Sequence, residues 1–138
     1  MGVKREACLS APVDESRIAR DLGALSLIGR TSDNSLTRLA YTEAGDEAFE
    51  YLVSQSRAIG LNTYRDSFGN LYSMAPAALG RRPVIMGSHL DTVIGGGAYD
   101  GSLGVVAALE VMRLVAGTQG LGDLPIVLAP NVFWVTQR

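Results

Sequence analysis

Apolar residues recur at helical spacing in three separate segments of the chain. The segments run from Asp14 to about Gly29, from Thr42 to Gly60, and from about Ser102 to Ala116. Their apolar positions are Ile18, Leu22, Leu25 and Ile28 in the first, Phe49, Leu52, Val53 and Ile59 in the second, and Val105, Val106, Leu109, Met112 and Val115 in the third. The first segment begins with acidic residues, the second begins with a threonine that can cap a helix, and each of these two segments ends at a glycine. These residue types fit helix boundaries. We predict three helices and expect the first two to pack on one sheet.

Short runs rich in β-branched and aromatic residues predict strands between these helices. Residues 61–65 and 71–74 flank a loop, 66–70, whose residue types tolerate tight turns, so a hairpin is expected. Further strands are predicted at 83–88 and 124–128, and the first of these leads through a glycine-rich loop into the third helix. A strand, a loop and a helix in this order are typical of an α/β unit, in which functional groups gather beyond the carboxyl ends of the strands.

The loop after the third predicted strand holds the strongest chemical signal. His89 and Asp91 are two residues apart, so in an extended segment their side chains point the same way while Leu90 packs on the other face. The glycines at 95–97 allow a sharp turn that returns Asp100 to the neighbourhood of His89. An imidazole nitrogen and a carboxylate oxygen are ligands for zinc and related divalent ions, and a carboxylate can bridge two ions. We predict the first half of a metal site, in which Asp91 accepts the other ring N–H of His89.

Each of these residues also has a purely structural interpretation. His89 is compatible with a hydrogen-bonded histidine at a strand end, Asp91 with a turn cap beside Thr92, and Asp100 with the N-cap of the helix that follows. A phosphate cradle is disfavoured, because the loop lacks the lysine of a P-loop and the spaced glycines of a dinucleotide-binding motif. One histidine together with two aspartates favours the metal site.

Composition narrows the class of protein. The chain has 138 residues, of which 47% are hydrophobic and 19% charged, which predicts one soluble domain over residues 1–138 with its own core. The net charge is -2 and the 12 basic residues are scattered, so nucleic acid is not expected as a partner. No apolar run approaches the roughly 18 residues of a membrane span, and the N-terminus lacks the apolar stretch of a secretory signal. Cys8 has no partner for a disulfide within the chain, so we expect a cytoplasmic location and no membrane partner.

The motifs together resemble a known enzyme family. From Leu25 to about Ile126 the chain is similar to the N-terminal portion of the bimetal amidohydrolases of the zinc peptidase superfamily, which include N-carbamoyl-L-amino-acid hydrolase, allantoate amidohydrolase and β-ureidopropionase. The matching motifs are Thr37-Arg38-Leu39-Ala40, Asp66-Ser67-Phe68-Gly69-Asn70-Leu71, Gly87 to Val93, Gly96-Gly97, Asp100 to Val105, and Leu109-Glu110-Val111. The resemblance implies part of an α/β/α catalytic domain of the zinc-peptidase type. It implies an enzyme, homodimeric in the intact family, that hydrolyses a linear amide or ureido C–N bond of a small-molecule substrate such as an N-carbamoyl amino acid or allantoate.

The resemblance also implies two divalent metal ions, which are zinc, manganese, cobalt or nickel. His89 matches the family's first metal ligand, Asp100 the carboxylate that bridges both metals, and Asp91 the acid of the catalytic site that supports the histidine. An aminopeptidase, dipeptidase or deacylase of the same superfamily shares these residues and stays an alternative, as does a non-catalytic binding domain. The Gly-Gly-x-x-Asp-Gly loop and the segment Thr37-Arg38-Leu39 favour the carbamoylase branch.

The chain departs from the family pattern at three places. Ile94 stands where the family usually has proline, and Ala98-Tyr99 where it favours arginine and phenylalanine, which bears on loop shape or substrate fit. The family's Glu-Glu pair, a general base followed by a metal ligand, falls at Trp134 and Val135. The later histidine ligands and the lid and dimerisation domain have no counterpart here. We therefore expect residues 129–138 to be an atypical tail, the ligand set to be incomplete, and this chain to be an inactive fragment of a catalytic domain.

Overall fold

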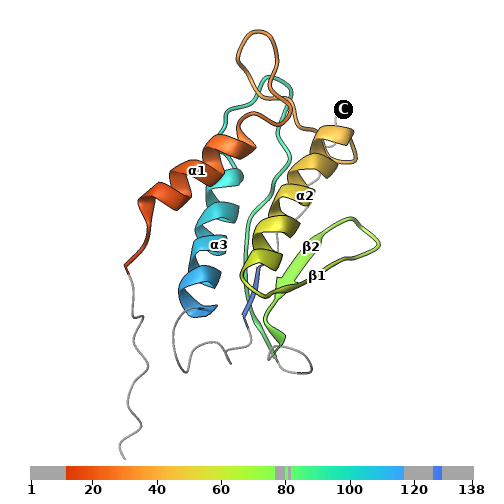
Figure 1. The fold of residues 1–138 in the computed structure, drawn as a ribbon. Helices are drawn as coiled ribbons and strands as arrows, with labels where there is room; N and C mark the ends of the chain where they lie inside the picture. Colours follow the sequence, from red (N-terminus) through yellow and green to blue (C-terminus); the bar gives the residue numbers. More distant parts are fainter. Residues whose placement is uncertain (1–11, 77–79, 81, 117–125, 129–138) are drawn as a thin grey trace, which may run out of the picture.

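The computed structural model describes residues 12–76, 80, 82–116 and 126–128. These residues form the helices α1 (Glu15–Leu25), α2 (Glu43–Ala58) and α3 (Ser102–Ala116), and the strands β1 (Asn62–Arg65), β2 (Leu71–Met74), β3 (Val84–Met86) and β4 (Ile126–Leu128). Figure 1 shows their arrangement. Each predicted helix and strand is present, which confirms the α/β class. The predicted tail at 129–138, with Trp134 and Val135, lies outside the described residues.

Local signals set the helix ends. The Asp14 carboxylate accepts a hydrogen bond from the N–H of Arg17 at the start of α1, and the Thr42 hydroxyl accepts one from the N–H of Gly45 at the start of α2. Both are N-caps that satisfy a main-chain donor of the first turn. Shortly after α2, Gly60 has a φ of 80°, which favours glycine and ends the helix.

Helix α1 ends at Leu25, earlier than the prediction that extended it to about Gly29. The N–H groups of Leu27 and Ile28 donate to the carbonyls of Ala24 and Leu25, three residues back, so the chain tightens into turns after Leu25. Ile28 nevertheless packs in the core. Apolar spacing therefore continues through a segment that is no longer α-helical.

The four strands form one mixed sheet in the order β1-β2-β4-β3. Strands β1 and β2 are the predicted antiparallel hairpin, and the N–H of Asp66 closes its loop by donating to the carbonyl of Asn70. β4 pairs antiparallel with β2 and parallel with β3, where Ile85 lies opposite Val127. β3 is shorter than the predicted 83–88, because pairing with β4 stops at Met86. The residues beyond Met86 form the loop that carries the predicted site.

The helices gather on one face of this sheet. Helix α2 packs on β1 and β2, α3 packs on β4, and α1 packs mainly against α3 (Figure 1). The expectation that the first two helices lie on one sheet thus holds for α2, whereas the main contacts of α1 are with α3. Four leucines from α1, α2, β2 and α3 are almost completely buried between these elements: Leu25, Leu52, Leu71 and Leu109.

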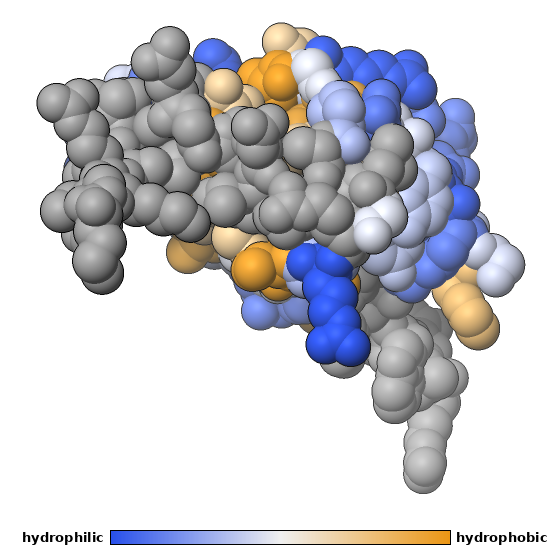
Figure 2. All heavy atoms as spheres, turned by 90° about the horizontal axis from the view of Figure 1, so that it is seen from below, coloured by the Kyte–Doolittle hydropathy of each residue, from blue (hydrophilic) through white to orange (hydrophobic). Residues whose placement is uncertain are grey.

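The opposite face of the sheet carries a smaller apolar cluster. Tyr64 and Tyr72 stack with ring centroids 4.8 Å apart, and Tyr72 and Met74 pack against Val127. Figure 2 shows the molecule from below, where hydrophilic residues predominate among those described and the hydrophobic ones form separate areas. Within the described residues, none of the helices combines the length and apolar character that a membrane span requires.

Candidate metal centre

The loop after β3 is anchored to the core at Leu90, which is 2% exposed and belongs to the main core cluster. Because side chains alternate along an extended segment, His89 and Asp91 lie on the other side of the chain from Leu90. The His89 side chain is 26% exposed and the Asp91 side chain 5%. His89 therefore reaches the surface, while the acid beside it stays buried.

His89 contacts both aspartates, through different ring nitrogens. Its Nδ1 lies 3.0 Å from the main-chain oxygen of Asp91 and 3.5 Å from Oδ1 of the same residue, and its Nε2 lies 3.6 Å from Oδ2 of Asp100. A carbonyl oxygen only accepts, so we assign the ring proton to Nδ1, which donates to Asp91 and leaves Nε2 as an acceptor. The structure brings the three predicted site residues together. The shorter contact to Asp91 is to its main chain, where a carboxylate contact was expected.

Two glycines allow the start of α3 to approach His89 this closely. A Cβ atom at Gly101 would overlap the carbonyl oxygen of His89 and lie 2.6 Å from two of its ring atoms, and the φ of Gly101 is 69°. A Cβ atom at Gly104 would lie 2.7 Å from Cβ of Ser88. Residues 88–89 and the first turn of α3 are therefore in direct contact, which places Asp100 beside the imidazole.

The contacts of Asp100 and Thr92 bear on two structural interpretations, in which Asp100 is the N-cap of α3 and Asp91 caps a turn beside Thr92. Asp100 holds the first turn of α3 through its main chain, since its carbonyl accepts from the N–H of Ser102 at 2.7 Å, while its side chain is 86% exposed. The Thr92 hydroxyl accepts from the N–H of Arg38 and donates to the carbonyl of Leu36, so Thr92 is bound to a distant segment. The exposed Asp100 carboxylate is open to a ligand from solvent.

Nε2 of His89 and Oδ2 of Asp100 lie at a separation that suits two ligands of one divalent ion. Two ligands about 2.0–2.1 Å from a zinc ion, at the tetrahedral angle, are about 3.4 Å apart, and the Nε2 to Oδ2 distance is 3.6 Å. Both atoms are acceptors in the assigned tautomer, and a cation between them satisfies both. In the part of the chain that the structure describes, no group of three or more histidine, cysteine or acidic residues is arranged to hold a metal.

The segment 36–38 supports the site, a role that the sequence analysis missed. The main chains of Leu36 and Gly96 exchange two hydrogen bonds, the N–H of Thr92 donates to the carbonyl of Arg38, and the Thr37 hydroxyl accepts from the N–H of Gly95. The Arg38 side chain is completely buried; burial lowers its pKa, and the nearby Asp91 opposes that shift. The available signal was a single positive charge within the otherwise uncharged segment 36–41, which contains the motif Thr37-Arg38-Leu39-Ala40.

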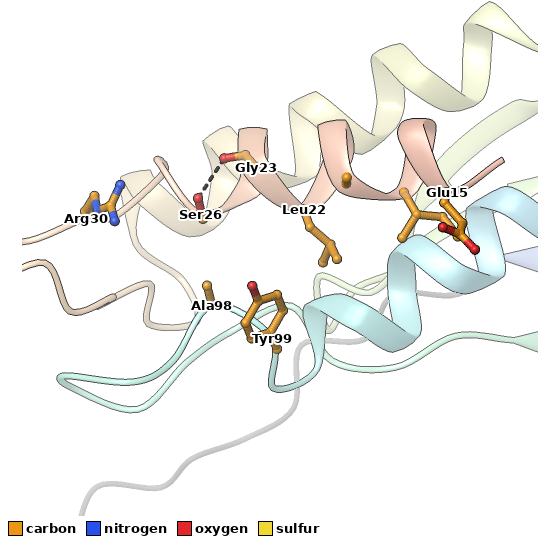
Figure 3. A pocket seen from close by; sticks show the side chains of 9 residues that line it. Glu15, Leu22, Gly23, Ser26, Arg30, Ala98 and Tyr99 are labelled. Carbon is orange, nitrogen blue, oxygen red and sulfur yellow. Dashed lines mark hydrogen bonds between the residues drawn. The ribbon is translucent and has the colours of Figure 1, made fainter.

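A groove of about 470 Å³ lies between α1 and the loop that contains Tyr99. Figure 3 shows Ala98 and Tyr99 on one side of it, opposite Leu22, Gly23 and Ser26 of the α1 segment. The charged residues Glu15 and Arg30 also line it. Tyr99 is next to Asp100 in the sequence, but none of the three candidate site residues lines this groove.

His89 and Asp100 thus lie side by side in the loop beyond β3, next to the start of α3, and comparison with known proteins indicates the class. The model of peptidase family M28 matches residues 70–131. The chain is 35% identical over 105 residues to the N-carbamoyl-L-amino acid amidohydrolase of Geobacillus stearothermophilus, covering 73% of this chain and 25% of the relative. It is 36% identical over 97 residues to the allantoate amidohydrolase of Bacillus subtilis (strain 168), covering 70% of this chain and 24% of the relative.

A solved structure extends the match to the fold. A hydantoinase/carbamoylase family amidase from Burkholderia ambifaria superimposes with a TM-score of 0.76 and 33% identity, over 86% of this chain and 29% of that chain. The chain therefore belongs to the family of these amidohydrolases, as the resemblance predicted. It spans about a quarter of the length of the curated relatives it matches.

Proposed function

We propose that this chain forms part of the catalytic domain of a metal-dependent amidohydrolase that cleaves a linear amide or ureido C–N bond. The observation that carries the proposal is the 3.6 Å separation of His89 Nε2 and Asp100 Oδ2, which suits a shared divalent ion. The substrate class follows the names of the relatives, an N-carbamoyl amino acid or allantoate. A small-molecule substrate and a cytoplasmic location belong to the same proposal.

Each site residue has a distinct part in this mechanism. His89 offers Nε2 as a ligand, and the hydrogen bond from its Nδ1 to Asp91 holds the ring in the required orientation. Asp100 offers an exposed carboxylate whose two oxygens can serve two ions. A divalent ion bound here would polarise the carbonyl of the scissile amide. Zinc, manganese, cobalt and nickel all accept this mixture of nitrogen and oxygen ligands.

We propose further that the 138-residue chain has negligible turnover by itself. A catalytic zinc usually has three protein ligands, and His89 and Asp100 provide two within the described residues. Hydrolysis also needs a general base near the attacking water. An assay of the purified chain with N-carbamoyl amino acids and allantoate, with each of the four metals added, should show no product. Product above the metal-only blank contradicts this part of the proposal.

Metal binding is testable on the same chain, because His89 is its only histidine. Titration with Zn²⁺ should shift the ring signals of His89 in NMR spectra, and Asp100→Asn should weaken binding by about ten-fold or more. Asp46→Asn is the matched control, since Asp46 is an exposed acid that pairs with Arg65. Equal zinc affinity in the wild type and Asp100→Asn would contradict the site.

The second candidate is a peptidase or deacylase of the same superfamily. It is favoured by the match of residues 70–131 to peptidase family M28. The named relatives over most of the chain are amidohydrolases, which is why the ureido or amide substrate is preferred. Assaying any form of the protein that shows turnover on ureido acids and on dipeptides, side by side, separates the two. Faster turnover of dipeptides would favour the peptidase.

A further inference from the structure

Arg38 is the largest fully buried side chain among the described residues, and it is charged. None of the ion pairs found in those residues includes it. A buried cation is costly unless hydrogen bonds replace its hydration. The acceptors that surround Arg38 therefore indicate what this charge does in the fold.

The guanidinium of Arg38 joins three separate parts of the chain. Its Nη1 donates to the carbonyl of Leu25, the last residue of α1, at 2.7 Å and to that of Ile28, in the turn that follows, at 3.1 Å. Its Nε donates to the carbonyl of Leu90 at 2.8 Å, and its Nη2 donates to the hydroxyl of Ser102 at 2.9 Å. All of these acceptors are neutral, so the contacts fix positions without neutralising the charge.

Two of these acceptors are next to the candidate metal ligands. Leu90 lies between His89 and Asp91, and Ser102 is the first residue of α3, two positions after Asp100. The main chain of Arg38 also exchanges hydrogen bonds with Thr92, whose N–H donates to the Arg38 carbonyl. One residue is thus bonded both to the loop that carries His89 and to the helix start that follows Asp100.

We infer that Arg38 is a positioning residue that sets the separation of His89 and Asp100, an inference that rests on the function proposed above. The planar guanidinium donates in three fixed directions at once, to Leu90, to Ser102 and to the end of α1. Lysine has the same charge, but its single ammonium group does not donate in several fixed directions. It therefore cannot hold the three parts of the chain in the same geometry. The positive charge also faces the buried Asp91, which supports the His89 ring.

The test compares Arg38→Lys with Arg113→Lys in the full chain. Arg113 is a matched control, because its side chain is also almost buried but pairs with Asp21 and Gln55, between the helices. The readout is the NOE between the ring Hε1 of His89 and the α protons of Gly101, which are adjacent in the structure. Arg38→Lys should lose this NOE and bind Zn²⁺ about ten-fold more weakly. Arg113→Lys should keep the NOE even if its melting temperature falls.

The NOE decides between positioning and general loosening of the fold. Retention of the NOE in folded Arg38→Lys, or its loss in folded Arg113→Lys, overturns the inference. If Arg38→Lys does not fold, Ser102→Ala decides, because it removes the Nη2 acceptor and leaves the arginine in place. A weakened NOE in Ser102→Ala supports positioning, and an unchanged one overturns it. Failure of the wild type to bind Zn²⁺ would remove the proposed function alone, since the NOE needs no metal.

Discussion

At the residue scale, Gly101 is the position where the site has least room. Its φ of 69° is unfavourable for other residues, and a Cβ atom would overlap the His89 carbonyl and crowd the ring. We expect Gly101→Ala to lower the free energy of unfolding by on the order of 2–4 kcal/mol, from backbone strain together with steric overlap. Urea denaturation of the purified variant measures this loss.

Gly97 provides the control for that substitution. It lies in the same loop, has no positive φ, and a Cβ atom there would meet nothing within 4 Å. Gly97→Ala should therefore change stability by less than about 1 kcal/mol. If both alanine variants unfold at the same urea concentration, the close approach of His89 to the start of α3 is wrong.

Asp91 is the residue whose carboxylate and carbonyl both face Nδ1 of His89. Asp91→Asn removes the negative charge but keeps the main-chain acceptor, so the ring should stay in place while becoming a weaker ligand. We expect Zn²⁺ affinity, measured by calorimetry, to fall by about 10- to 100-fold. Affinity equal to that of the wild type would show that the main-chain hydrogen bond alone supports His89.

At the element scale, a network of charged side chains joins α1 to α3. Asp21 of α1 is fully buried and pairs with Arg113 of α3, and it also accepts a hydrogen bond from the hydroxyl of Tyr51. In the same interface, Glu110 of α3 is paired with Arg17 of α1 at 2.6 Å. The two helices are therefore held by ion pairs as well as by apolar contacts.

This network predicts a loss of stability in acid. Burial by itself raises the pKa of Asp21, but hydrogen bonds from Tyr51 and Arg113 outweigh it and the pKa is lowered; the hydrogen bond from Arg17 lowers the pKa of Glu110. Carboxyls with a lowered folded-state pKa stabilise the fold above their unfolded values, about 3.9 and 4.3. The melting temperature should hold between pH 7 and 5 and fall as the pH drops below about 4.

Asp21→Asn tests the assignment of that acid sensitivity. The variant should be less stable at pH 7 by on the order of 3 kcal/mol, because Arg113 is left as a nearly buried cation without its partner. Its melting temperature should also depend less on pH between 5 and 3 than that of the wild type. An unchanged slope would assign the acid sensitivity to other carboxyls.

The helices show how far local sequence signals predict an element. The segments predicted from Thr42 to Gly60 and from Ser102 to Ala116 match α2 and α3 within two residues at each end, because caps, glycines and apolar spacing act locally. The first helix was predicted too long, since Ile28 packs in the core from a turn. The strand order depends on pairing between distant segments, which spacing along the chain does not encode.

At the scale of the whole molecule, the candidate site combines a local pattern with distant support. The juxtaposition of His89, Asp91 and Asp100 was predictable, because a short strand end and a glycine loop bring them together within 12 residues of sequence. The role of Arg38 was not, because its acceptors Leu90 and Ser102 are 52 and 64 residues away. The motif Thr37-Arg38-Leu39-Ala40, which indicated only the family resemblance, thus includes the residue that supports the site.

The last prediction concerns metal and the stability of the whole chain. An ion that binds only the folded state raises the free energy of unfolding by about 1.4 kcal/mol at ten times its Kd, which is a few degrees in Tm for a domain of this size. We expect Zn²⁺ to produce this rise in the wild type and in Asp46→Asn, and His89→Gln to abolish it, since Nε2 of His89 is one of the two proposed ligands. A Tm that rises equally in His89→Gln would place the stabilising ion elsewhere on the molecule, and the rim of the sheet beyond β3 would no longer be the metal centre.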